Sequence, residues 1–127
     1  MRAPTPSGSH DRARALARSA DSRKAEDIVL LDLRGRTSVC DSFLICSASS
    51  GRQARAIAEG MVRDLRAAGM SPIGVEGMDA GRWVLLDFGD VLVHVFDAPY
   101  RDFYDLEGLW SDAPRVRLQL DAPAVGA

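Results

Sequence analysis

The sequence has little cysteine and no long apolar run, and each shortage excludes a class of protein. Cys40 and Cys46 belong to no Cys-x-x-Cys motif and to no Cys/His pair, so we expect two reduced thiols and no zinc site. No apolar stretch approaches the ~18 residues that a membrane span requires. We therefore expect a cytoplasmic protein that binds neither a membrane nor a metal nor another cofactor.

The net charge is small as well. Sixteen basic and 18 acidic residues leave −2 at pH 7, so the whole chain has no electrostatic attraction to a nucleic acid, and DNA is not an expected partner. Hydrophobic residues make up 46% of the 127 residues and charged residues 27%, which is typical of one soluble folded domain. We divide the chain into a disordered leader over 1–9, one compact domain over 10–112, and a flexible C-terminal tail over 113–127.

The order of apolar patterns predicts an α/β domain with a mixed β-sheet flanked by helices. The clearest element is an amphipathic helix that begins near residue 50, shows apolar residues every three or four positions, and ends at Gly69. A Gly-Asp pair at 89–90, between two apolar runs, predicts a β-hairpin. In chain order we expect a helix over 11–22, strands over 27–32 and 42–47, the amphipathic helix, strands over 73–75, 83–88 and 91–96, and a helix over 100–109.

Two short motifs suggest an enzyme. Asp87-Phe88-Gly89 matches the magnesium-binding triplet of protein kinases, but the glycine-rich loop, strand lysine and catalytic loop are missing, so we interpret it as a hairpin turn. Ser47-Ala48-Ser49-Ser50 lies between a strand and a helix, where free N–H groups can bind an anion. Helix capping is the favoured interpretation. Arg52 and Arg55 nevertheless add positive charge there, which leaves an acidic partner open.

Seven of the eight aromatic residues lie between Trp83 and Trp110. In the strand over 91–96 valines occupy alternate positions, so we expect the core on the valine side and His94 on the face of Leu92 and Phe96. The helix that follows has one stripe that we expect in the core, made of Phe103, Leu106, Leu109 and Trp110. A neighbouring stripe that we expect partly in water is made of Tyr100, Tyr104 and Glu107. Because Tyr, Trp and Arg dominate the energetics of protein interfaces, this region favours a binding surface over an active site.

Three segments together resemble the ribosomal silencing factor family, RsfS, also called Iojap-like. They are KAEDIVLLDLRG, DSFLICSASSGRQARAIAEGM and RWVLLDFGDVLVHVFDAPYRDFYDLEGLW, and the match runs from about Lys24 to Asp112. Its most specific part is W-x-x-x-D-x-G-D-x-x-V-H-x-F followed by R-x-F-Y-x-L-E-x-L-W.

The resemblance implies a fold related to nucleotidyltransferases but without their catalytic motif, and hence no enzymatic activity. It implies binding to the large ribosomal subunit through that subunit's protein fourteen, on the subunit-joining face. There the protein would block docking of the small subunit and repress translation under nutrient limitation or in stationary phase. A homodimer in the free state is a further implication. Two alternatives stay open: a factor for large-subunit assembly, or a residual magnesium-dependent nucleotidyltransferase-type enzyme around Asp87, Asp90 and His94.

The matching residues also imply a ribosome-binding surface, with Trp83 as its packing anchor. The expected contacts at this surface are Trp83, Asp87, His94, Arg101, Tyr104 and Glu107. Ser49 and Arg52 are expected as secondary contacts. Phe96 is expected in the core with the first stripe of the last helix, and no residue is expected to be catalytic or to bind a metal.

Overall fold

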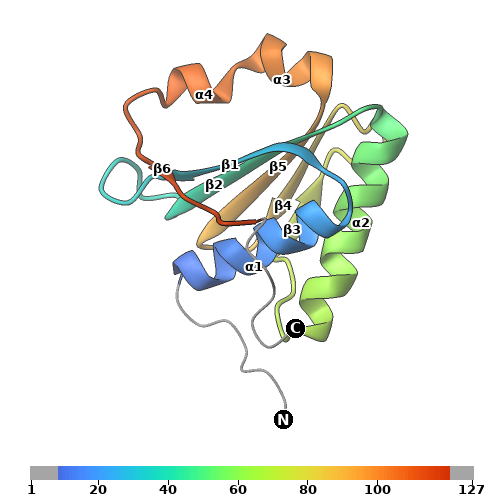
Figure 1. The fold of residues 1–127 in the computed structure, drawn as a ribbon, viewed down its shortest axis with the longest axis horizontal. Helices are drawn as coiled ribbons and strands as arrows, with labels where there is room; N and C mark the ends of the chain where they lie inside the picture. The colour runs from blue at the N-terminus through green and yellow to red at the C-terminus, as the bar shows by residue number, and fades with distance from the viewer. Residues whose placement is uncertain (1–8, 121–127) are drawn as a thin grey trace.

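The computed structural model describes residues 9–120, which form one β-sheet with helices on both faces (Figure 1). The elements follow in the order α1 (Ser9–Ser22), β1 (Glu26–Asp32), β2 (Ser42–Ala48), α2 (Gly51–Ala67), β3 (Gly74–Glu76), β4 (Trp83–Asp87), β5 (Val91–Asp97), α3 (Ala98–Tyr104), α4 (Leu106–Leu109) and β6 (Arg115–Val116). Within these residues, no helix is both long enough and apolar enough to span a membrane.

The six strands form a single mixed sheet in the order β3-β4-β5-β2-β1-β6. β2 and β5 are parallel neighbours, and every other neighbouring pair is antiparallel. Parallel strands need a long crossover connection, which α2, β3 and β4 supply here. The expected α/β fold with a mixed sheet is therefore confirmed, including the hairpin of β4 and β5.

α1 and α2 cover one face of the sheet and enclose the larger part of the core (Figure 1). The alternate valines of β5 point to this side, and all three are fully buried, as expected. Ile57 and Met61 of α2 pack against them from the helical layer. Burial of each such side chain stabilises the fold by about 1.5–3 kcal/mol. Ser50 caps the N-terminus of α2, because its side chain accepts a hydrogen bond from the Gln53 N–H at 3.0 Å.

α3 and α4 lie over the opposite face, where a smaller core surrounds Ile45 and Phe96 (Figure 1). The single helix expected over 100–109 is wrong, because the chain breaks at Asp105, which has a left-handed φ of 47°. The Asp105 carboxylate accepts the Gly108 N–H at 3.0 Å and starts α4 in a new direction.

The break also changes which side chains of the last helical region are buried. Phe103 and Leu109, which we expected in the core, are 70% and 73% exposed. Leu106 and Trp110 are half-buried against the smaller core, and Phe96 is fully buried as expected. Side chains spaced for one continuous helix do not stay on the same side of the chain after a left-handed residue. The expected stripe is therefore divided between buried and exposed positions.

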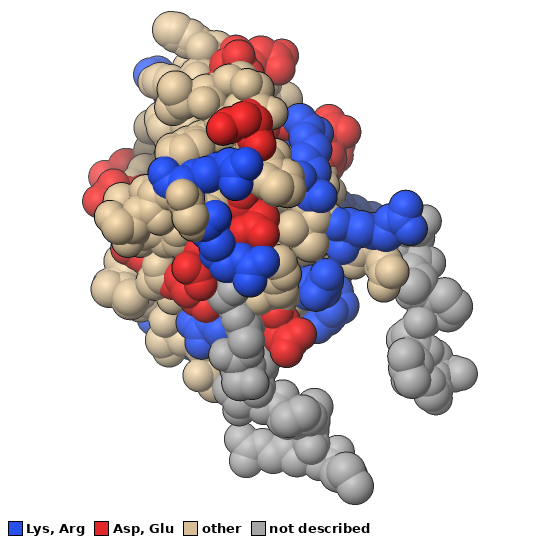
Figure 2. Space-filling model, turned by 90° about the vertical axis from the view of Figure 1, so that its left-hand side faces the viewer, with Lys and Arg blue, Asp and Glu red and all other residues tan. Residues whose placement is uncertain are grey.

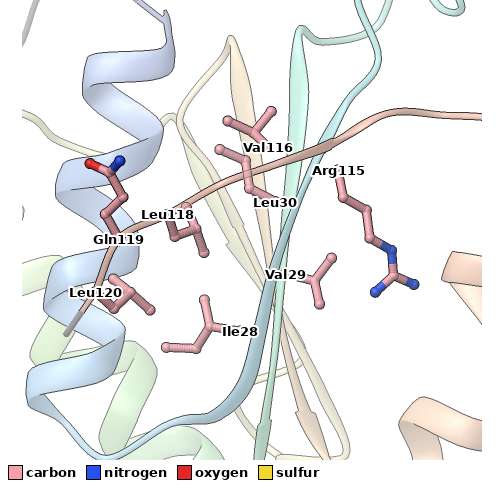
Figure 3. Close-up of a pocket in the computed structure, with 8 residues that line it drawn as sticks. All are labelled: Ile28, Val29, Leu30, Arg115, Val116, Leu118, Gln119 and Leu120. Atoms are coloured by element: carbon pink, nitrogen blue, oxygen red, sulfur yellow. The ribbon is translucent and has the colours of Figure 1, made fainter. Parts of the chain in front are cut away.

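The sheet extends past residue 112, where we had ended the domain. β6 pairs with β1 through Leu30 opposite Val116, and Ala113 just before it is buried. The chain from Arg115 to Leu120 then forms one side of an open pocket of about 370 Å³, and residues 28–30 of β1 form the other (Figure 3). At the other end α1 begins at Ser9, inside the expected leader. The rest of the leader, residues 1–8, and residues 121–127 of the tail lie outside the described residues.

Candidate functional site

The face of the sheet beneath α3 and α4 is only partly covered, and its open part is rich in aromatic side chains. We call the surface formed by Phe43, Trp83, Leu85, Leu92 and Tyr104 the aromatic face. β2, β4 and β5 supply its strand residues, and the end of α3 supplies Tyr104. All five side chains are half-buried or exposed, above a fully buried Phe96.

Trp83 lies at the centre of the contacts between these rings. Its indole stacks on Phe96 at 5.0 Å between ring centroids with 28° between the planes, and it meets Tyr104 at 4.7 Å. A pocket of about 290 Å³ opens beside it, lined by Glu76, Gly77, Trp83 and Leu85. Trp83 is therefore packed on one side and accessible on the other, as an aromatic anchor at an interface needs to be.

His94 fixes the orientation of the Trp83 ring through a hydrogen bond. The indole N–H of Trp83 donates to Nδ1 of His94 at 3.0 Å, so the neutral imidazole carries its proton on Nε2. His94 is only 4% exposed, and burial lowers the pKa of His94 to about 4 from its ordinary 6.5. The ring meets Phe43 edge-on at 4.5 Å between centroids. His94 thus supports the aromatic face and does not contact solvent.

Arg101 and Glu107 tie α3 and α4 to the sheet. Arg101 donates to the Glu107 carboxylate at 2.8 Å, to the Ser47 hydroxyl at 2.8 Å, and to the backbone carbonyl of Asp27 at 2.6 Å. The hydrogen bond from Arg101 lowers the pKa of the Glu107 carboxyl below its ordinary value. These two residues, expected at the binding surface, therefore make their contacts inside the protein and fix the position of α3 and α4.

The other expected site residues lie apart from Trp83. Asp87 shares its face of β4 but lies about 13 Å along the strand, where its carboxylate accepts the Gly89 N–H at 2.8 Å in the hairpin turn. Ser49 donates to the side chain of Gln53 at the start of α2, and Arg52 is exposed on that helix. The structure therefore brings together Trp83, His94 and Tyr104, with Arg101 and Glu107 nearby.

Phe43 and Leu85 were not identified from the sequence as parts of this surface. Alternation along β4 puts Leu85 on the face of Trp83, and that signal was available. Phe43 reaches the face because β2 pairs in parallel with β5, which sets Phe43 opposite Leu92. A pairing between strands so far apart in the chain cannot be predicted from a local sequence pattern.

The residues of the enzymatic alternative do not converge on one site. Asp90 pairs with Arg12 of α1 at 3.1 Å, whereas Asp87 accepts the Gly89 N–H in the hairpin turn and His94 is buried beside Trp83 on the opposite face of the sheet from α1. Burial raises the pKa of the Cys46 thiol to about 12, so this thiol stays protonated at neutral pH. Among residues 9–120, no group of three or more His, Cys, Asp or Glu side chains is arranged to hold a metal ion.

Comparison with known proteins places this fold and its motif in one family. The family model described as "Ribosomal silencing factor during starvation" matches residues 6–126. Ribosomal silencing factor RsfS of Bacillus subtilis is 46% identical over 102 residues, which cover 80% of this chain and 86% of the relative. A crystal structure of a Chromobacterium violaceum protein is similar with a TM-score of 0.80 and 34% identity, over 83% of this chain and 88% of that chain.

A more distant relative carries a different name. The mouse protein called mitochondrial assembly of ribosomal large subunit protein 1 is 30% identical over 90 residues, which cover 68% of this chain and 40% of that protein. The match of the family model over nearly the whole sequence, together with the similarity to the bacterial relatives, decides the assignment. This chain belongs to the ribosomal silencing factor family.

Proposed function

We propose that this protein binds the large ribosomal subunit through the aromatic face and prevents the small subunit from joining. The observation that carries the proposal is Trp83, which is held in place by Phe96 and His94 yet borders an open pocket. Soluble proteins rarely leave large contiguous apolar surfaces in water unless a partner covers them. Phe103 and Leu109 extend the exposed apolar surface along α3 and α4.

The proposed partner is protein fourteen of the large subunit, on the subunit-joining face. A domain bound there would occlude the small subunit by its volume alone, so no chemical step is required of it. Repression of translation under nutrient limitation would follow, and the family description, which names starvation, supports this condition. On this proposal the protein is not an enzyme, and the separate contacts of Asp87 with Gly89, of Asp90 with Arg12 and of His94 with Trp83 fit that view.

A second candidate is a role in large-subunit assembly, which the name of the mouse relative favours. Both roles involve the same subunit, but they differ in the particle that is bound. A silencing factor must bind the mature large subunit, whereas an assembly factor binds immature particles and leaves when they mature.

The two roles separate in a sedimentation experiment with the purified full chain. It would be mixed in turn with mature large subunits, immature large-subunit particles and small subunits, and centrifuged through sucrose gradients. We expect the protein to sediment with mature large subunits and to stay at the top of the gradient with small subunits. Sedimentation with immature particles alone would support assembly, and sedimentation with none of the three would contradict both roles.

A further inference from the structure

We propose that the outer side of α2 is a second interaction surface, which binds the phosphate backbone of RNA. Four arginines lie on this side, Arg52, Arg55, Arg63 and Arg66, and we call them the arginine stripe. Their spacing places all four within about 80° of arc around the helix and over about 21 Å of its length. The proposal concerns a surface separate from the aromatic face and does not rest on the function proposed above.

No ion pair of the described residues holds the arginine stripe, which carries four arginines and one acid, Glu59, between Arg55 and Arg63. Arg52, Arg63 and Arg66 are exposed, and among residues 9–120 none of the four arginines forms an ion pair. Arg55 donates only to the backbone carbonyl of Asp79, at 3.2 Å. Of the two acids in α2, Asp64 is held by Arg23 at 2.7 Å, which leaves Glu59 as the one free carboxylate of the helix among the described residues.

The other charged surfaces are arranged differently. The exposed side of α1 carries two arginines and two acids at equivalent spacing, Asp11, Arg14, Arg18 and Asp21, and so has no net charge. On the face at the β6 edge, basic and acidic side chains are intermixed (Figure 2), and there Arg34 pairs with Asp32 and Arg36 with Asp112. Residues 74–112 hold nine acids and two arginines. The small net charge of the chain therefore conceals a positive helix face and a negative segment around the aromatic face.

The arrangement of the arginine stripe fits a phosphate backbone. Arg52 with Arg55, and Arg63 with Arg66, are each three residues apart, so each pair presents two neighbouring guanidinium groups. A guanidinium binds phosphate oxygens through two parallel N–H bonds, and its charge is independent of pH. Two such pairs about 16 Å apart can contact a double-stranded RNA at separate phosphate positions, in the manner of proteins that recognise the shape of the duplex.

One end of the stripe lies close to the aromatic face. Gly81 is buried against the backbone of Gly51 at the start of α2, and Trp83 follows two residues later. Arg55 contacts the same loop through Asp79. A particle made of protein and RNA could therefore contact the aromatic face with a protein and the arginine stripe with RNA at the same time.

The test measures binding of the purified protein to a fluorescent RNA duplex of generic sequence over a series of salt concentrations. The double variant Arg63→Gln/Arg66→Gln removes two stripe charges and keeps similar helix propensity. Arg14→Gln/Arg18→Gln removes the same charge from α1 and is the matched control.

We expect the stripe variant to bind the RNA about tenfold or more weakly at about 50 mM salt, with a slope of log K against log salt reduced by about two. The α1 variant and Trp83→Ala should bind RNA within about twofold of the unchanged protein.

Several outcomes would overturn the proposal. Failure of the unchanged protein to bind RNA at low salt would do so directly. An equal loss in the α1 and α2 variants would mean that net charge, and not the stripe, controls binding. Displacement of the RNA by polyglutamate at equal charge would mean that the stripe accepts any polyanion, an acidic protein included. None of these results bears on large-subunit binding through the aromatic face, because the RNA is presented without ribosomal proteins.

Discussion

At the scale of single residues, Trp83 and His94 decide the shape of the aromatic face. A half-exposed indole with no polar partner could adopt several orientations, but the hydrogen bond from its N–H to His94 Nδ1 and the stack on Phe96 select one. A fixed ring loses less conformational freedom when a partner binds, which favours affinity. We therefore propose Trp83 as the residue that contacts the partner and His94 as the residue that positions it.

Replacement of Trp83 by alanine should weaken binding to the large subunit without unfolding the protein. Removal of a central aromatic anchor costs about 2 kcal/mol or more of binding free energy, which is about a thirtyfold loss of affinity. The fold should persist because the ring is only half-buried. Binding would be measured by cosedimentation over a range of protein concentrations, with urea unfolding as the check on folding.

Ile73→Ala is the matched control for this variant. Ile73 is 76% exposed and lies beside the Gly89 turn, at the far end of the hairpin from Trp83. Its loss should leave affinity unchanged. If both variants bound as tightly as the unchanged protein, Trp83 would not be the anchor.

Stability should fall as the pH drops, because His94 is buried in its neutral form. Burial lowers the pKa of His94 to about 4 in the folded protein, whereas in the unfolded chain it keeps its ordinary value of 6.5. Between these values the unfolded chain binds a proton that the folded protein does not, so the free energy of unfolding decreases as pH falls. The decrease attributable to His94 should reach about 3 kcal/mol at pH 4.

Comparison with His94→Gln separates the effect of His94 on the pH dependence of unfolding from the effect of the acidic residues. The amide oxygen of Gln can still accept the Trp83 N–H but does not titrate. Urea unfolding of both proteins from pH 7.5 to pH 4 should therefore show the smaller decrease in the variant. Parallel curves for the two proteins would mean that His94 is protonated as readily in the folded state as in the unfolded chain.

At the scale of elements, the turn before β4 determines the position of Trp83, the first residue of that strand. Gly77 has a φ of +83°, and a Cβ added there would collide with the backbone oxygen of Trp83. Gly35 has a similar φ of +80° but open space around it. Gly35→Ala should cost about 1–2 kcal/mol of unfolding free energy through its conformation alone.

Gly77→Ala should cost more than Gly35→Ala, since the backbone of β4 must also move. We expect an additional loss of about 2 kcal/mol, together with faster amide hydrogen exchange in β3 and β4. Urea unfolding and exchange measurements on the two variants would check this. Equal losses in both would show that the contact with Trp83 is relieved without displacement of the strand.

α3 and α4 should depend on Arg101 for their attachment to the sheet. Arg101→Gln removes the ion pair with Glu107 and the bonds to β1 and β2, and should lower the free energy of unfolding by about 2–3 kcal/mol. Arg115 also contacts Glu107, at 3.3 Å, but its side chain is 63% exposed, so Arg115→Gln should cost less than about 1 kcal/mol. Urea unfolding compares the two, and a larger effect of Arg115→Gln would contradict this account.

The elements that could be predicted from the sequence are those whose signals are local. The apolar spacing of α2 and the turn between β4 and β5 lie within one element or one hairpin, so their positions were found. The break at Asp105 was missed because it depends on a non-glycine residue with positive φ, which no pattern of apolar residues reveals. β6 was missed because two residues, Arg115 and Val116, form a strand only when β1 is alongside.

The same distinction applies to the candidate site. Trp83 and His94 were both expected at the binding surface, but the hydrogen bond between them depends on side-chain orientation. Arg101 was expected to face a partner, whereas its contacts with Ser47 and Asp27 come from strands far away in the chain. The contacts that each of these side chains makes could therefore not be predicted from the sequence.

At the scale of the whole molecule, the two faces of the sheet are covered differently. α1 and α2 close one face into a large core, whereas α3 and α4 leave part of the other face open (Figure 1). The open face carries the rigidly held aromatic residues, and the closed face carries the arginine stripe on its outside. On the proposed function, a protein of 127 residues that makes its contacts through the open face would act by occupying space at the subunit-joining face.

The most direct test of this account is a subunit-joining experiment in sucrose gradients. Purified large and small subunits would be mixed at a magnesium concentration that allows joining, without added protein, with the unchanged protein, and with Trp83→Ala. We predict that the unchanged protein sediments with large subunits and depletes joined ribosomes, and that Trp83→Ala at the same concentration does so far less. Joined ribosomes at full yield, with the unchanged protein bound to the large subunit, would contradict occlusion as the mechanism.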